Sequence, residues 1–184
     1  MELSFSEVFL KVLEFSRDEA VRTGWHNIGV EHIMLGILRQ ADNEACRALE
    51  AAGVRPGDVK GRIDDAVFVG DEQVPWAERE RILLCDSACS MMQRAALEMK
   101  RCHDSELTPL HFLLAVCRSG GNRCSDILSD MGVSLEKLLD ATVGRERYGL
   151  ATEAPEPPAI DANLLAAAIE ARLRRGYGTD DLAS

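Results

Sequence analysis

The sequence predicts an all-α fold of two tandem four-helix repeats related by pseudo-twofold symmetry, followed by a C-terminal tail with one short helix. Its long runs are rich in Ala, Leu, Glu and Arg, which favour helix over strand. A shift of 79 residues, which places Glu31 on Leu110, aligns one half of the chain with the other. Residues that typically begin and end helices recur at matching positions in both halves.

The self-alignment is clearest where residues 31–39 meet residues 110–118, two apolar runs that each contain a histidine near the start. Further matches follow without a gap. They pair Glu19 with Glu98, Arg22 with Arg101, Asn43 with Asn122, Leu49 with Leu128, and Gly53 with Gly132. The pairs lie at helix boundaries, so we interpret them as a duplicated supersecondary unit rather than a chance match.

The first repeat, about residues 3–68, is expected to hold four helices, because N-cap residues and glycines divide it at regular intervals. The second of these helices is apolar on nearly every face and should lie at the centre. The expected helices run from Ser6 to Gly24, over about 30–39, from Asn43 to Gly53, and from Pro56 to about residue 68.

The second repeat, about residues 76–144, follows a linker at 69–75 and has N-cap residues and glycines at corresponding positions. We expect two such units to bury the flanks of their central helices against each other within one domain, residues 1–144. The expected helices cover about 76–102, begin at Thr108-Pro109 and end near residue 118, run from Asn122 to Gly132, and run from Ser134 to about residue 143.

The tail, residues 145–184, has a different composition. Residues 152–158 form a Pro-rich acidic linker that should be extended. Leu165, Ile169 and Leu173 then recur every four residues in a short helix that ends near Gly176. That helix either packs weakly, because short isolated helices are marginal, or docks on a partner or on its own domain.

Composition and charge exclude several classes of function. The formal net charge is −10, which argues against a nucleic-acid partner, because phosphate binding needs clustered Lys and Arg. No apolar run is long enough to span a bilayer, and the first residues do not resemble a signal peptide. We therefore expect no membrane partner and a cytoplasmic protein whose six cysteines are reduced.

The paired blocks resemble the Clp repeat, the N-terminal domain of Hsp100/Clp AAA+ unfoldases of the ClpC, ClpA and ClpB type. Residues 24–39 carry it as GWHNIGVEHIMLGILR, and residues 108–114 resemble its second-repeat form as TPLHFLL. The opening Phe5-Ser6-Glu7 and the closures at 49–54 and 128–133 are also similar to the family pattern. The resemblance covers about residues 3–144.

The resemblance implies a non-catalytic module that receives protein substrates or adaptor proteins and passes them to an AAA+ ring and its peptidase. No G-x-x-x-x-G-K-[ST] phosphate loop occurs, so we expect neither cofactor nor enzymatic activity from these residues. The alternative is a free-standing mimic that competes with the unfoldase for adaptors. A reading frame that continues beyond Ser184 into a phosphate loop would favour the first interpretation, and a stop codon the second.

In the ClpC branch, a hydroxyl at the start of the first helix and the Glu of the second helix help to form a phosphoarginine pocket. Ser6 and Glu31 fall on those positions. The other interpretation of Glu31 is a first-turn acid that complements the helix dipole. Val30 replaces the family threonine, and the equivalent second pocket has Cys85 and Leu110 instead of hydroxyl and acid.

Histidines and cysteines offer further candidates. His32 and His111, the latter near the Thr108 cap, are expected to hydrogen-bond at helix starts, and metal ligation is the alternative. Cys85 and Cys89 lie four residues apart, so they either fill the core or contribute to a zinc site, and a zinc or thiol enzyme is the third functional class. Trp25 and Trp76 are expected to be either core anchors or exposed contacts for unfolded segments. We expect no resident metal.

Overall fold

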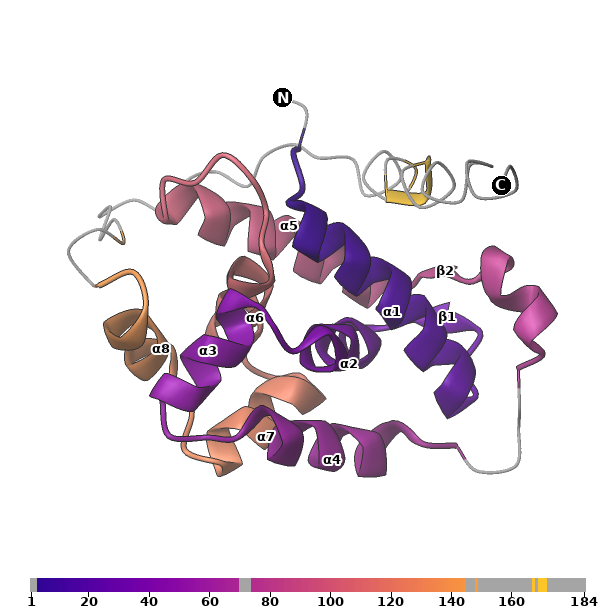
Figure 1. Cartoon of the computed structure of the whole chain (residues 1–184), viewed down its shortest axis with the longest axis horizontal. Coiled ribbons are helices and arrows are strands. Elements are labelled where there is room, and N and C mark those ends of the chain that lie inside the picture. The colour runs from indigo at the N-terminus through magenta and orange to yellow at the C-terminus, as the bar shows by residue number, and fades with distance from the viewer. Residues whose placement is uncertain (1–2, 70–73, 145–147, 149–166, 168, 172–184) are drawn as a thin grey trace, which may run out of the picture.

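The computed structural model describes residues 3–69, 74–144, 148, 167 and 169–171, and Figure 1 shows their arrangement. These residues form mainly helices, together with one short two-stranded ladder. The all-α prediction is therefore confirmed. In chain order the elements are α1 (Glu7–Thr23), β1 (Asn27–Ile28), α2 (Val30–Gln40), α3 (Glu44–Ala51), α4 (Pro56–Val67), the 3-10 helix η1 (Trp76–Arg81), β2 (Leu83–Leu84), α5 (Asp86–Arg101), α6 (Pro109–Ser119), α7 (Arg123–Asp130) and α8 (Leu135–Ala141).

Helix starts are where the predicted caps place them. The Ser6 hydroxyl accepts a hydrogen bond from the backbone N–H of Phe9 at 3.2 Å, which satisfies a donor that the helix itself leaves unpaired. Three further predicted caps accept equivalent bonds, namely Asn43, Asn122 and Ser134. At the other end of α1, Gly24 has φ 87°, a conformation that glycine adopts without steric cost.

The predicted long helix over residues 76–102 is wrong. Residues Trp76–Arg81 form a 3-10 helix, the chain is extended at Leu83–Leu84, and α5 begins only at Asp86. The cause is a parallel pairing in which β2 lies against β1, from a segment more than fifty residues away. The backbone N–H of Cys85 adds a 3.0 Å hydrogen bond to the carbonyl of Ile28, so these residues bond across the fold instead of within a helix.

The core is centred on α2 and α6, whose side chains are buried on almost every face, as their apolar composition predicts. Figure 1 shows α2 near the middle of the molecule, with α1 on one side and α4 on the other. The contact between α1 and α2 is very close at Gly36. A Cβ atom there would lie 2.5 Å from the Ser16 hydroxyl and 2.6 Å from the Val12 carbonyl. The Ser16 hydroxyl already donates to that carbonyl at 2.6 Å, so only glycine fits.

The two halves exchange backbone contacts. Ahead of α1, Phe5 bridges to Leu107, and the N–H of Ser6 donates to the Leu107 carbonyl at 3.1 Å. Ahead of α5, Cys85 bonds Ile28 in the same way. The shift of 79 that relates Ser6 to Cys85 also relates Ile28 to Leu107. These contacts are those expected of a pseudo-twofold relation between the halves, which itself stays a prediction.

The predicted Pro-rich linker and most of the predicted tail helix lie outside the described residues. Two positions of the tail region that are described pack on the domain. Tyr148 and Ile169 are 4% and 1% exposed, and both belong to the same apolar cluster as the core of the repeats. Within the described ranges, no helix combines the length and the apolar character needed to cross a membrane.

The close contact at Gly36 leads to a stability prediction. Gly36→Ala should lower the free energy of unfolding by about 1–2 kcal/mol, because the overpacking penalty exceeds the gain in helix propensity. The matched control is Gly61→Ala in α4, where an added Cβ meets no atom within 4 Å. This variant should stabilise the protein by about 0.5–1 kcal/mol. Urea unfolding followed by circular dichroism measures both, and equal stabilisation by the two substitutions would contradict the prediction.

Candidate protein-binding site

Exposed apolar side chains surround the junction where α1 leads into β1. We call this surface the apolar rim and define it as Trp25, Phe68, Val69 and Leu83. Their exposed fractions run from 41% for Trp25 and Leu83 to 59% for Phe68. Single exposed apolar residues are ordinary on a protein surface, whereas several on connected segments make a candidate binding surface. Trp76 on the neighbouring η1 is also 63% exposed.

Hydrogen bonds hold the segments of the apolar rim together. The indole Nε1 of Trp25 donates to the carbonyl of Val67 at 2.7 Å, and the N–H of Val69 donates to the carbonyl of Thr23 at 3.2 Å. Leu83 joins them because it pairs with Asn27 in the β1–β2 ladder. The end of α4 is therefore joined to the end of α1, and β2 is joined to the strand that follows α1. Of the predicted contact residues, both tryptophans are exposed, and sequence reasoning missed the other rim residues.

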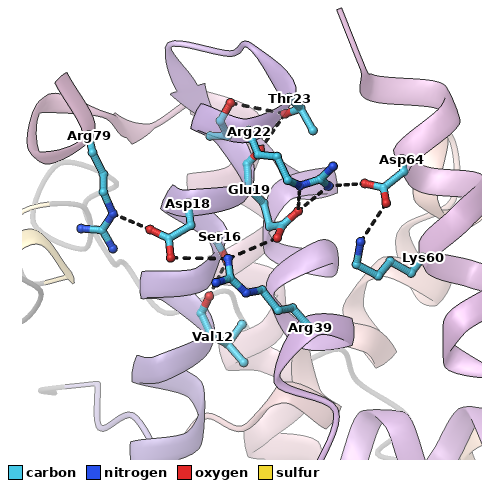
Figure 2. Close-up of polar contacts among 11 residues, drawn as sticks. Val12, Ser16, Asp18, Glu19, Arg22, Thr23, Arg39, Lys60, Asp64 and Arg79 are labelled. Atoms are coloured by element: carbon cyan, nitrogen blue, oxygen red, sulfur yellow. Dashed lines mark hydrogen bonds and ion pairs between the residues drawn. The ribbon is translucent and has the colours of Figure 1, made fainter. Parts of the chain in front are cut away.

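A network of charges on α1 fixes the elements that carry the rim (Figure 2). The carboxylate of Glu19, whose side chain is 3% exposed, accepts hydrogen bonds from Arg22 and from Arg39 of α2. Arg22 also pairs with Asp64 of α4. A buried carboxylate is tolerated only when it is paired, so this one holds α1, α2 and α4 in a fixed arrangement.

The 3-10 helix is attached to the same side of α1. The Asp18 carboxylate accepts a hydrogen bond from Arg79 of η1, and Arg39 lies 3.4 Å from its second oxygen. Arg17 reaches Glu80 of η1 at 3.3 Å. Since Arg79 is itself buried and its guanidinium lies over the Trp76 ring, these pairs also fix the position of Trp76.

The second half contains a similar buried carboxylate. Glu98 of α5, whose side chain is 1% exposed, accepts hydrogen bonds from Arg101 at 2.6 Å and from Arg118 of α6 at 2.7 Å. Its other oxygen accepts from the phenol of Tyr148, which also contacts Arg118. The self-alignment matches Glu19 with Glu98, but the sequence alone does not show which arginines pair with these two carboxylates.

His32 is a structural residue at the start of α2. Its Nδ1 accepts a hydrogen bond from the N–H of Gly29 at 2.8 Å, so the proton of the neutral ring lies on Nε2. Nε2 is 3.1 Å from the Thr23 hydroxyl, which in turn donates to the Glu19 carbonyl at 2.7 Å. Burial, helped by the charge of Arg22, lowers the pKa of His32 from 6.5 to about 4.

His111 occupies the equivalent place in the second half. Its Nδ1 accepts from the N–H of Thr108 at 3.0 Å, and Nε2 lies 3.0 Å from the Asp104 carboxylate. Cys102, Asp104 and His111 offer three ligand atoms within 4.8 Å of one another. A metal on Nε2 would require a proton on Nδ1, where the Thr108 N–H already donates. The arrangement therefore fits a hydrogen-bonded helix cap better than a metal centre.

The expected phosphoarginine pocket of Ser6 and Glu31 is not assembled. Ser6 begins α1, whereas Glu31 adjoins His32, which contacts Thr23 at the opposite end of that helix. A helix of 17 residues is about 25 Å long at roughly 1.5 Å per residue, so the two side chains cannot hold one small group. Val30, which replaces the family threonine, is 5% exposed and belongs to the core.

In the structure, the four pocket positions Ser6, Glu31, Cys85 and Leu110 do not pair as the family resemblance implies. Around Gly29, both the Glu31 carboxylate and the Cys85 thiol come within 4.0 Å of where a Cβ atom would lie, so Glu31 adjoins the start of α5. Ser6 bonds Leu107 ahead of α6, and Leu110 is buried in the first turn of that helix. The Ser6 hydroxyl therefore lies near the start of α6, which has Leu110 in place of an acid, and the Glu31 carboxylate lies near the thiol of Cys85. Neither site has both groups that the family pocket uses.

The cysteines have the chemistry of buried structural thiols. Burial raises the pKa of Cys46 to about 11 and that of Cys117 to about 12, and it raises the pKa of Cys89 and Cys124 as well. Thiols with such raised pKa values stay protonated at neutral pH, and the thiolate is the form that attacks substrates or binds metals. Cys85 is partly exposed, and its Sγ lies 3.0 Å from the Ser87 hydroxyl. The raised pKa values of Cys46, Cys89, Cys117 and Cys124 disfavour a catalytic role for these four thiols.

Comparisons with known proteins match the repeat region. A family model described as the Clp repeat (R) N-terminal domain matches residues 4–131. Over 133 residues the chain is 31% identical to the chaperone protein ClpB of Oceanobacillus iheyensis and 30% identical to the negative regulator of genetic competence ClpC/MecB of Bacillus subtilis. Each match covers 72% of this chain but only 16% of the length of the relative.

A solved structure shows the same fold. The N-terminal domain of Hsp104 from Candida albicans superposes with a TM-score of 0.61 at 14% sequence identity. The match covers 78% of this chain and 91% of that one.

The environment of His32 leads to a pH prediction. Because its folded-state pKa of about 4 lies below the ordinary 6.5, the unfolded chain binds the proton more readily. Stability should be unaffected by this group above about pH 6.5 and should fall by up to about 3 kcal/mol as the pH drops to about 4. Urea unfolding at pH 7.0, 5.5 and 4.5 measures the wild type against His32→Gln. The difference between the two proteins should shrink toward acid pH, and parallel profiles would contradict the assignment.

Proposed function

Because the chain belongs to the family of Clp repeat N-terminal domains, we propose that it is a non-catalytic module that docks substrate or adaptor proteins for a Clp-type AAA+ unfoldase and its peptidase. The family model covers most of the repeat region, which supports a binding role. The ring and the peptidase are partners in this proposal, since the matched region is a small part of each relative. We place this activity in the cytoplasm.

The observation that carries the proposal is the apolar rim on a rigid support. Trp25 and Phe68 expose large apolar areas although the charge network beneath them holds their helices in place. A preorganised aromatic surface loses little conformational entropy on binding, and aromatic side chains dominate the energetics of protein interfaces. The rim therefore offers a ready contact for apolar groups of another polypeptide.

The occupant that we propose is an extended, apolar segment of a non-native protein. One relative is named a chaperone, and non-native chains expose the apolar side chains that such a surface can bury. Leu83 of β2 and Trp76 of η1 are both exposed and lie on consecutive elements of the chain. A folded adaptor that uses the same residues is the alternative that the experiment distinguishes.

The rim and the neighbouring Trp76 predict selective losses of binding. Phe68→Ala and Trp76→Ala should each raise the Kd for a reduced, carboxymethylated and permanently unfolded protein by about five- to thirtyfold, because each removes an exposed aromatic contact. Fluorescence anisotropy of the labelled unfolded protein measures the affinity. Val8→Ala is the matched control, since Val8 is 38% exposed but lies in the first turn of α1, at the end of that helix opposite Trp25.

Two outcomes would contradict the proposed occupant. If wild type, Phe68→Ala and Trp76→Ala bind the unfolded protein equally, the rim and the neighbouring Trp76 are not the contact surface. If the wild type does not bind it at all but captures a folded adaptor in a rim-dependent way, the module docks adaptors rather than unfolded segments. Melting curves of each variant verify that binding losses do not reflect unfolding.

A further inference from the structure

A second surface feature lies on the other half of the molecule. Between α5 and α6 there is a hollow of about 230 Å³, and its lining includes Arg94, Leu97, Glu98, Arg101, Ala115 and Arg118. We propose that this hollow, the arginine pocket, binds a phosphate group carried by a phosphate monoester. The apolar rim and the family pocket positions lie on other residues, so this site is additional to them.

The charge balance of the arginine pocket is positive. Three guanidinium groups face a single carboxylate, that of Glu98, which gives a local charge of about +2 in a chain of net charge −10. Arg101 and Arg118 both bond the same Glu98 oxygen, at 2.6 and 2.7 Å. One carboxylate neutralises only one of these cations, so the excess charge remains for a ligand.

Arg94 is the most available of the three cations. It lies on α5 one turn before Glu98 and two turns before Arg101, so all three share one helix face. Its side chain is exposed, and no hydrogen bond or ion pair joins it to another residue in the described part of the chain. An arginine without an acid partner beside two that share one is the arrangement that a bound anion would complete.

The first half supplies a comparison within the same molecule. Under the shift of 79, Phe15 stands where Arg94 stands and Asp18 where Leu97 stands. The guanidinium of Arg39 lies 4.5 Å from the centre of the Phe15 ring and also pairs with Asp18, as Figure 2 shows for the acid. The first position is therefore filled and neutralised by the chain itself. The two replacements each add one unit of positive charge to the second half.

The geometry favours a phosphate monoester over other anions. A monoester carries about −1.5 to −2 charges at pH 7, which matches the excess in the pocket. Arginine binds phosphate oxygens through two parallel N–H bonds, and Glu98 holds Arg101 and Arg118 in fixed positions before the ligand arrives. The hollow is many times larger than the roughly 10–15 Å³ that a cavity needs to hold one water, so it admits a phosphate with its first linking atoms.

The phosphate could be part of a polypeptide side chain or of a free small molecule, and the test separates these sources. Isothermal titration calorimetry with the full chain uses three probes at low salt: a phosphoserine hexapeptide, its unphosphorylated form, and inorganic phosphate. We expect the phosphopeptide to bind at least tenfold more tightly than its unphosphorylated form. Affinity should fall when the pH drops below about 6, where the monoester loses its second charge.

Two variants each remove one unit of the positive charge that the second half has relative to the first. Arg94→Gln deletes the unpaired cation, and Leu97→Asp restores the acid of the first half. Each should weaken phosphopeptide binding at least tenfold. Arg94 is exposed and Leu97 is partly exposed on α5, and melting curves verify the fold of both variants. The matched control is Arg62→Gln, which removes an exposed arginine from α4, outside the pocket, and should leave the affinity unchanged.

Each outcome decides one point. Tighter binding of the phosphopeptide than of inorganic phosphate would assign the site to a phosphorylated polypeptide, and equal or weaker binding would assign it to free phosphate compounds. No binding of either probe would overturn the proposal. So would an equal loss in Arg94→Gln and Arg62→Gln, which would show general charge attraction only. None of these probes has apolar side chains, so failure here is separate from failure of the rim to bind unfolded protein.

Discussion

The buried carboxylate of Glu19 is the constraint on which much of the described structure depends. It lies in the interior of the α1–α2 contact, where an unpaired charge would be strongly unfavourable, so Arg22 and Arg39 must stay beside it. Through Arg22 the constraint extends to Asp64 of α4, and through the adjacent Asp18 it extends to η1. The exposed aromatic residues are carried by these same elements. A rigid apolar surface is therefore a consequence of one buried charge and its partners.

The two halves share the residues that hold their helices together and differ in the residues around them. Both halves retain a buried glutamate with two arginines, and this shared part joins the first helix of each half to the second. What surrounds it differs. In the first half Phe15 and Asp18 contact Arg39, whereas in the second half Arg94 and Leu97 stand at those positions and the ring of Tyr148 lies against Arg118. Since the framework is provided by the shared residues, the residues around it are free to differ without loss of the fold.

The sequence predicted the features that depend on local chemistry. Caps such as Asn43 and the glycine at position 24 act over three or four residues, so their effect can be inferred without knowing the fold. The β1–β2 ladder could not be inferred, because its partners are distant in sequence and the helical periodicity of residues 76–102 concealed it. The same reason explains the error at Ser6 and Glu31: their relation to family positions was visible, but the residues of the other half that lie beside each of them were not.

The crossed backbone contacts have a consequence for how the chain arose and how it can be divided. The N–H of Ser6 in one half and that of Cys85 in the other each depend on a carbonyl supplied by the opposite half. A single repeat on its own would leave that donor and the flank of its central helix without partners. It could recover both only by associating with an identical copy, as a symmetric homodimer in which the two chains exchange these contacts. Fusion of two such subunits turns an association that depends on concentration into an intramolecular one.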